Sequence, residues 1–257
     1  MKNAIKISTI IIALVLVGCK KIDASKGTKE DHQVDLTTFT SVDMAISGEM
    51  NYTQSTSTSI VVNCSEKVFK ALDITVKDSH LHFGLKKGYI LTNTDDIKIT
   101  VTSPDINALS VSGSGSIKAD FLTDNIPNLD LDVSGSGLIT TNQINGTTVK
   151  QTVSGSGDLT TLISATSIQS NISGSGLITT DGSANSSNLT ISGSGSFQGF
   201  ELITADTKVS VSGSGMSEVY ADSSLIVNIS GSGSVHYKGS PGITSTGSGS
   251  GALINAN

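Results

Sequence analysis

The stretch from Val111 to Ile117 reads Val-Ser-Gly-Ser-Gly-Ser-Ile, and its Ser-Gly-Ser-Gly tetrad recurs through the whole C-terminal half of the chain. Successive tetrads are separated by 22, 20, 19, 19, 20, 18 and 18 residues. A flexible glycine–serine linker does not need such regular spacing, so the tetrads mark a structural repeat. The first serines of the eight tetrads are Ser112, Ser134, Ser154, Ser173, Ser192, Ser212, Ser230 and Ser248.

Apolar residues flank the tetrads at fixed positions. Val or Ile directly precedes each of the first seven tetrads, and an apolar residue follows two places after the last glycine in every repeat except the one with Ser217. Alternation with a period of two predicts β-strands with one buried face, and β-branched residues favour strands as well. If the alternation continues through the tetrad, both serines face outward. Both glycines then face inward, where they allow a tight bend or a close approach of the walls.

A strand pattern that returns after about twenty residues predicts an all-β fold in which each coil stacks on the one before it. We therefore expect residues 111–257 to form a single-stranded parallel β-helix that rises roughly 4.8 Å per coil. We favour a right-handed winding over a left-handed one. An antiparallel β-sandwich or barrel with one hairpin per repeat is the alternative.

Residues 37–110 lack the tetrad and differ in composition. Fourteen of the 70 residues in 36–105 are charged, against 14 of the 147 residues in 111–257. Strand-like runs alternate here with turn residues such as Asp78 and Ser79. We expect a β-rich N-terminal part that continues into the solenoid as its first irregular coils or its end cover.

The N-terminus has the features of a bacterial export signal. A basic start precedes an apolar run from Ile7 to Val17, which is shorter than the roughly 20 residues of a membrane-spanning helix. The run ends in Leu-Val-Gly-Cys19, which resembles the lipobox of bacterial lipoproteins. The resemblance implies a signal peptide over residues 1–18, cleavage before Cys19, and lipid attachment at Cys19 by a diacylglyceryl group and a further acyl chain such as palmitate.

Residues 19–36 read as a polar tether between this lipid and the folded part. Acyl chains hold a protein on a bilayer because each buried methylene contributes about 0.8 kcal/mol. Lys20 stands where, by analogy with other lipoproteins, an aspartate would retain the protein in the inner membrane. We therefore expect a bacterial cell-envelope protein whose partner is the outer membrane, to which its lipid anchor attaches it.

The lipoprotein signal, the charged β-rich segment from Ser57 to Gly84 and the repeated Val/Ile-Ser-Gly-Ser-Gly pattern together resemble the GIN-domain family of bacterial cell-envelope proteins, which are described as auto-transporter adhesin heads. The resemblance covers residues 38–240. It implies an all-β solenoid with an adhesive role, and it supplies no catalytic residues.

No constellation in the sequence indicates an enzyme. A polysaccharide-active β-helix enzyme, the less favoured reading, needs clustered carboxylates, whereas the ten acidic residues after Ser110 are scattered. Calcium-binding β-rolls place an acid after their glycines, but only the tetrad ending at Gly157 is followed by one. His80 and His82 share one side of a strand without an evident third metal ligand, and Cys64 reads as a small core residue. We expect no catalytic residue, no metal and no cofactor.

The outer surface of the repeat region is the remaining candidate for a functional site. A net charge of −6 lacks the cationic excess that nucleic-acid binding needs. Stacked coils place the first serines of the tetrads in one column of hydroxyl groups, which suits a glycan or a host or envelope protein. We expect a membrane-anchored, non-catalytic surface binding or adhesion module, with an envelope scaffold or spacer as the alternative. The candidate binding ladder consists of Ser112, Ser134, Ser154, Ser173, Ser192, Ser212 and Ser230.

Overall fold

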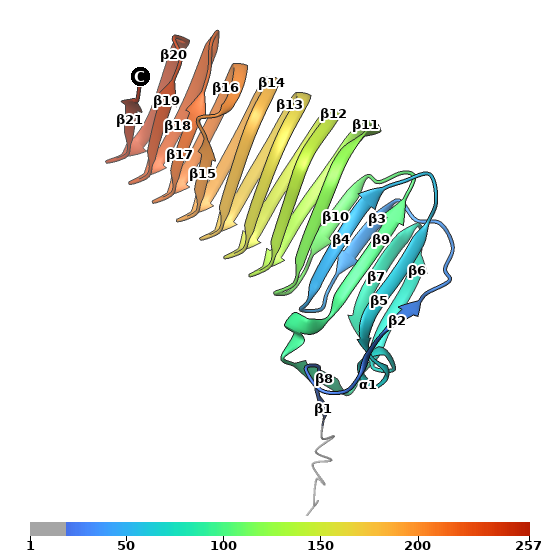
Figure 1. Ribbon diagram of the computed structural model, residues 1–257. Helices are drawn as coiled ribbons and strands as arrows, with labels where there is room; N and C mark the ends of the chain where they lie inside the picture. The colour runs from blue at the N-terminus through green and yellow to red at the C-terminus, as the bar shows by residue number, and fades with distance from the viewer. Residues whose placement is uncertain (1–18) are drawn as a thin grey trace, which may run out of the picture.

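The computed structural model describes residues 19–257, apart from the side chains of residues 123–125. The predicted signal peptide, residues 1–18, lies outside this range. The chain is 71% strand and 3% helix and winds into a β-solenoid of about seven turns (Figure 1). The all-β, β-helical prediction is therefore confirmed. No helix in the described range is long and apolar enough to span a bilayer.

The repeat region is built from coils that pair in parallel with their neighbours. Its strands are β10 (Ala108–Val111), β11 (Ser116–Gly135), β12 (Leu138–Gly155), β13 (Asp158–Gly174), β14 (Leu177–Gly193), β15 (Ser196–Gly199), β16 (Leu202–Gly213), β17 (Met216–Tyr220), β18 (Ser224–Gly231), β19 (Ser234–Lys238), β20 (Gly242–Gly249) and β21 (Ala252–Asn255). Every pairing among these strands is parallel, which excludes an antiparallel sandwich for this part.

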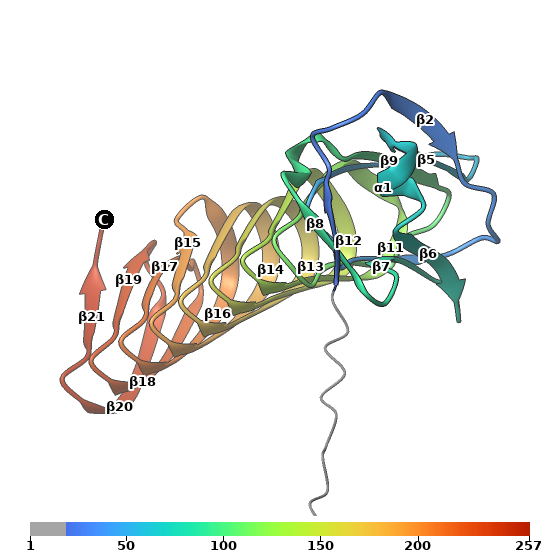
Figure 2. The same cartoon turned by 90° about the horizontal axis from the view of Figure 1, so that it is seen from below.

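Successive coils are aligned residue by residue at the tetrads. Ser134 pairs with Ser154, Ser154 with Ser173, and the series continues without a shift to Ser248. Differences in repeat length are absorbed elsewhere in the coil, for example between Thr140 and Ile144. The tetrads therefore form one corner that repeats along the solenoid, and Figure 2 shows the coils stacked one behind the next.

Each corner uses the two glycines of its tetrad differently. The first glycine has a φ of +119° to +127° in the seven tetrads from Gly135 to Gly249, a left-handed conformation that costs glycine little. The second glycine is buried in the seven tetrads from Gly115 to Gly233, and a Cβ atom at Gly157 would lie 2.5 Å from Cγ1 of Val133 in the preceding coil. The expected room inside the coil is thus provided by the second glycine, whereas the first one makes the bend.

The N-terminal part continues the solenoid and closes its end. Its elements are β2 (Lys29–Gln33), β3 (Ser41–Met44), β4 (Glu49–Gln54), β5 (Ser59–Ser65), α1 (Glu66–Phe69), β6 (Leu72–Lys77), β7 (His80–Leu85), the 3₁₀ turn η1 (Thr94–Asp96) and β9 (Lys98–Ser103). β3 and β4 pair in parallel with β10 and β11, while β7 and β9 add a further parallel layer beyond them. β5 and β6 then pair antiparallel with β9 and β7, and β2 pairs antiparallel with β5. The antiparallel strands cover this end of the parallel stack.

The segment that follows Cys19 lies against the folded body. β1 (Lys20–Asp23) pairs in parallel with β8 (Tyr89–Thr92) in a separate two-stranded sheet. Ile22 is only 1% exposed, so it fixes β1 to the core. Residues 19–36, expected to be a polar tether, therefore contribute β1 and β2. The buried Ile22 and Ala24 dock β1, and β2 is held by its pairing with β5.

A polar cluster around Gln151 interrupts the aliphatic interior of the solenoid. Gln151 lies in the inward column between Leu131 and Ser170. Its Nε2 donates to Oγ1 of Thr161 over 2.7 Å and to Oγ1 of Thr180 over 3.0 Å, and its Oε1 accepts from Ser170 over 2.7 Å. The four polar side chains are buried and satisfy one another, so the cluster links β12, β13 and β14 from the inside.

Candidate functional site

The serine ladder is a continuous column on the outer surface of the tetrad corner. Six of its seven serines are exposed, and Ser134 is half-buried. Paired residues of neighbouring strands lie roughly 4.8 Å apart, and within residues 19–257 no hydroxyl of the ladder is hydrogen-bonded to the next one. Within residues 19–257 the side-chain partners of ladder hydroxyls are two carboxylates: Ser112 donates to Asp43 over 3.3 Å, and Ser134 hydrogen-bonds Asp132. The other five hydroxyls are open to solvent or to a ligand.

A second outward column runs beside the ladder, two residues earlier in each coil. Residues two apart on one strand face lie roughly 6.6 Å apart. The two columns therefore form a grid of hydroxyl and amide groups with spacings of roughly 4.8 Å by 6.6 Å. We call this grid, from β12 to β18, the polar face, and it contains no charged side chain. The second column consists of Thr152, Asn171, Thr190, Ser210 and Asn228.

The same column becomes acidic where it meets the N-terminal part. Asp132, Ser110 and Asp43 continue it on β11, β10 and β3. Burial raises the pKa of Asp132, and the negative charges of Asp130 and Asp43 act in the same direction, against the hydrogen bond from Ser134 and the charge of Lys150. The polar face is therefore bounded at one end by a carboxylate group that holds its proton more strongly than usual.

The side chains of His80 and His82, on β7, are both hydrogen-bonded to residues of β3. Nδ1 of His80 lies 2.5 Å from Oγ of Ser41, and Nδ1 of His82 lies 2.7 Å from Oδ2 of Asp43. The serine and the carboxylate contact different histidines, so these four residues do not form the relay that activates a nucleophilic serine. Both histidines instead hold β7 against β3.

A cluster of potential metal ligands, which the sequence analysis missed, lies at the closed end. Side-chain atoms of Glu30, His32 and Glu66 lie within 4.8 Å of one another. The His32 ring stacks on Phe69 with centroids 4.1 Å apart, and Nζ of Lys70 lies 2.8 Å from Oε1 of Glu66. The hydrogen bond from Lys70 lowers the pKa of Glu66. The ring stack ties β2 to α1, and the members of the cluster are too far apart in sequence to suggest a motif.

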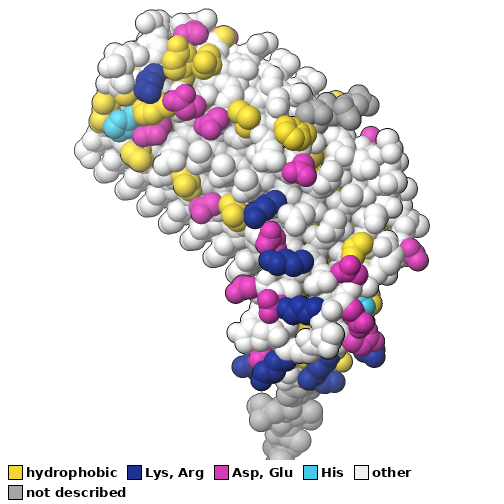
Figure 3. Space-filling model, in the orientation of Figure 1, with side chains coloured by type: hydrophobic (Ala, Val, Ile, Leu, Met, Phe, Trp, Pro, Cys, Tyr) yellow, Lys and Arg dark blue, Asp and Glu magenta, His cyan; other side chains and the backbone are white. Residues whose placement is uncertain are grey.

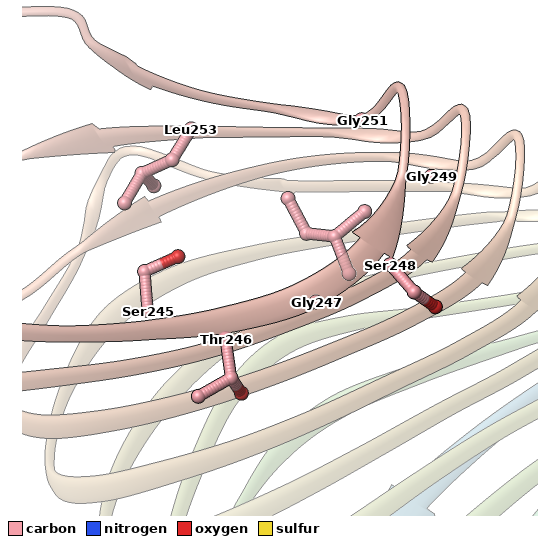
Figure 4. A pocket seen from close by; sticks show the side chains of 8 residues that line it. Ser245, Thr246, Gly247, Ser248, Gly249, Gly251 and Leu253 are labelled. Atoms are coloured by element: carbon pink, nitrogen blue, oxygen red, sulfur yellow. The ribbon is translucent and has the colours of Figure 1, made fainter.

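The other end of the solenoid is hollow. A cavity of about 230 Å³ is lined there by Ile229, Ser245, Leu253 and the last tetrad. Ser245 and Leu253 point into the interior, whereas Thr246 and Ser248 point outward (Figure 4). None of the lining residues is an acid or a base, so the hollow offers no proton donor or acceptor for catalysis.

The two cysteines have contrasting surroundings. Cys19 is exposed and directly precedes β1. Cys64 is 1% exposed, and burial raises the pKa of its thiol to about 11. Since the thiolate is the nucleophilic form, Cys64 is unreactive at neutral pH and serves as a core residue. Lipid attachment at Cys19 stays a prediction.

These features define a parallel β-solenoid with a hydroxyl-rich outer face. Residues 38–241 match the family described as "Putative auto-transporter adhesin, head GIN domain", and the chain belongs to that family. The resemblance inferred from the tetrads is therefore confirmed. None of the curated proteins compared with the chain matches it.

Three solved structures share the fold over almost the whole chain. A "Putative lipid binding protein" from Parabacteroides distasonis is 26% identical, with a TM-score of 0.87 over 93% of this chain and 100% of that one. A "putative adhesin" from Bacteroides fragilis is 25% identical, with a TM-score of 0.68 over 91% and 99%. A "putative adhesin" from Parabacteroides merdae, 19% identical, has a TM-score of 0.86 over 92% and 99% and shows the fold alone. Family and neighbours indicate an adhesin-like module of the cell surface or envelope.

Proposed function

We propose that this protein is a non-catalytic adhesion module, held in the outer membrane by an acylated Cys19, and that its polar face binds a glycan. The observation that carries the proposal is the unbroken register of the serine ladder. It places outward hydroxyls at a constant spacing on a rigid support, and five of them have no side-chain partner within residues 19–257.

A glycan suits this surface because both partners present repeated hydroxyl groups. Each hydrogen bond contributes only about 0.5–1.5 kcal/mol, so useful affinity requires several that form together. A rigid solenoid loses little conformational entropy when it binds, which preserves the sum of these small terms. The uncharged polar face also favours a neutral polymer over a strongly charged one.

The non-catalytic role is supported by the surroundings of the reactive side chains. Cys64 is a protonated core thiol, and His80 and His82 are engaged with separate partners. The anchor is supported by the lipobox-like sequence and by the exposure of Cys19. One solved structure of the same fold is named a "Putative lipid binding protein", which supports a location at a membrane.

A glycan array probed with two matched variants tests the proposal. The first variant replaces Ser154, Ser173, Ser192 and Ser212 of the ladder with alanine, and binding should fall at least tenfold because four hydroxyls are lost together. The second replaces the second serines of the same tetrads with alanine, and it should bind within twofold of the unmodified chain. Equal loss in both variants, or no binding of any glycan by the unmodified chain, would refute the glycan role. The control serines are Ser156, Ser175, Ser194 and Ser214.

A further inference from the structure

The folded body begins one residue after the predicted lipid anchor. All four residues of β1 pair with β8, from Lys20 opposite Tyr89 to Asp23 opposite Thr92. The N–H of Lys20 donates to the carbonyl of Gly88 over 2.7 Å, so the pairing starts immediately after Cys19. With an acyl group on Cys19, no flexible linker separates the bilayer from this sheet. The inference rests on the anchor of the proposed function, and it concerns the surface that the anchor brings to the membrane.

That surface combines lysines with one exposed apolar side chain. We call it the basal surface and define it by Lys20, Lys21, Lys86, Lys87 and Ile90, all of which are exposed. Lys21 and Ile90 are in-register partners, and Ile90 is 48% exposed. Lys86 and Lys87 belong to the turn that leads into β8. In Figure 3 lysine side chains gather, with some acidic ones, at the end of the molecule where Figure 1 places β1 and β8.

The acidic side chain of β1 is already paired. Asp23, the only carboxylate in β1, accepts hydrogen bonds from Asn93 over 3.0 Å and from Ser25 over 2.7 Å, and it lies 3.5 Å from Nζ of Lys26. The four basal lysines therefore keep a net positive charge. The rest of the molecule has the opposite balance, since residues 111–257 contain four lysines and ten acids.

We propose that the basal surface binds the headgroups of anionic phospholipids, with the four lysines against the phosphates and Ile90 between them. A lysine close to an anionic bilayer strengthens binding by roughly fivefold, and an exposed aliphatic residue adds its own transfer into the interface. The acidic solenoid is repelled by the same bilayer. Docking of the base thus points the solenoid, and with it the polar face, away from the membrane.

Vesicle sedimentation tests the proposal independently of acylation and of any glycan. The mature chain with Cys19→Ser, which cannot be lipidated, is mixed with phosphatidylglycerol/phosphatidylethanolamine vesicles and with phosphatidylcholine vesicles. We expect binding to the anionic vesicles at least tenfold tighter than to the neutral ones, and we expect this preference to decline as salt is raised from 50 to 300 mM. Equal binding to both vesicle types would overturn the proposal.

Two lysine variants test whether vesicle binding depends on the basal surface or only on the total charge of the protein. The basal variant replaces Lys20, Lys21, Lys86 and Lys87 with glutamine and should lose at least tenfold in affinity for the anionic vesicles. The control variant makes the same change in total charge on the solenoid and should lose less than threefold, whereas an equal loss in both variants would contradict the assignment. Ile90→Ser should weaken binding a few-fold at every salt concentration. The control lysines are Lys118, Lys150, Lys208 and Lys238.

The test also keeps this inference distinct from the adhesion proposal. If the basal variant binds vesicles like the unmodified chain while the ladder variant loses glycan binding, the basal surface has no lipid role and adhesion stands. If the basal variant alone loses binding, the lipid role stands whatever the glycan array shows.

Discussion

The regular solenoid and the N-terminal part wind the same kind of parallel stack by different means. In residues 111–257 each corner repeats one tetrad, with two small residues where successive coils come closest. In residues 41–103 the corners carry no common motif, and larger buried side chains such as Tyr52 and Phe83 fill the interior. Antiparallel strands from the same segment cover its end. The repeated motif extends the stack uniformly, whereas the N-terminal part adds parallel layers without a motif and ends in the antiparallel strands that close the stack.

The largest expected effect contrasts two first glycines of the tetrads. Gly155 has a φ of +127°, and a Cβ there would lie 2.6 Å from the Gly135 carbonyl oxygen. Gly113, which faces the N-terminal part, has an ordinary φ, and the nearest atom to its Cβ would lie 3.8 Å away. Strain and overpacking together should make Gly155→Ala cost about 4 kcal/mol, and Gly113→Ala less than about 1 kcal/mol. Urea denaturation followed by circular dichroism compares the two, and equal costs would refute the distinction.

The next largest effect concerns the polar cluster inside the solenoid. Gln151→Ala removes the side chain that Thr161, Thr180 and Ser170 share, and it leaves Ser170 without its partner. Loss of these buried hydrogen bonds together with the cavity should cost about 3 kcal/mol. The comparable change in the N-terminal part, Tyr52→Phe, removes the hydroxyl that hydrogen-bonds Ser103 and should cost about 1 kcal/mol. Denaturation midpoints of the two variants should rank in that order, and the reverse ranking would contradict the account.

Alkaline pH should weaken the N-terminal part specifically. Burial raises the pKa of Tyr52 from 10.0 to about 12. The stability linked to Tyr52 is therefore complete below pH 10 and is lost as the pH rises towards 12, because the unfolded chain releases its proton first. Between pH 8 and pH 11 this loss should be about 1.4 kcal/mol, and it should be absent in Tyr52→Phe. Denaturation at pH 8, 10 and 11 measures it, and parallel pH profiles for both chains would rule it out.

The smallest effect is a gain in stability. Ser217 occupies the inward position between Phe197 and Val235, and its buried hydroxyl has no hydrogen-bond partner within residues 19–257. Ser217→Ala removes this uncompensated hydroxyl and should stabilise the solenoid by about 1 kcal/mol. The exposed replacement Ser214→Ala should change nothing measurable. A loss of stability in Ser217→Ala would show that the hydroxyl is bonded.

The sequence predicted the regular solenoid well because one simple rule governs it. Inward aliphatics such as Val153 and Ile172, with tetrads at nearly constant spacing, leave few folds other than stacked coils. The same rule placed the serines of the ladder on the outer surface, where the structure has them. Gln151 was overlooked although it shares the inward parity of Val149 and Val153, because a polar residue at such a position is expected only when its partners are known.

The N-terminal part was predicted only in outline. Its strands pair over long sequence separations, as β3 does with β7 and β10, and no periodicity reports such pairings. The docking of β1 depends on two buried residues, Ile22 and Ala24, in a segment whose composition otherwise indicates a linker. The Glu30, His32 and Glu66 cluster is likewise assembled by the pairing of β2 with β5, which the sequence does not reveal.

The most direct test of the central claim is the distance between two residues of the serine ladder. Spin labels are placed at Ser154 and Ser248 of the chain with Cys19→Ser and Cys64→Ala, and the distance is measured by pulsed electron paramagnetic resonance. Five coil steps of roughly 4.8 Å predict a narrow distribution centred near about 24 Å. A broad distribution, or one centred well beyond that distance, would show that the tetrads are not stacked in register and would contradict the account.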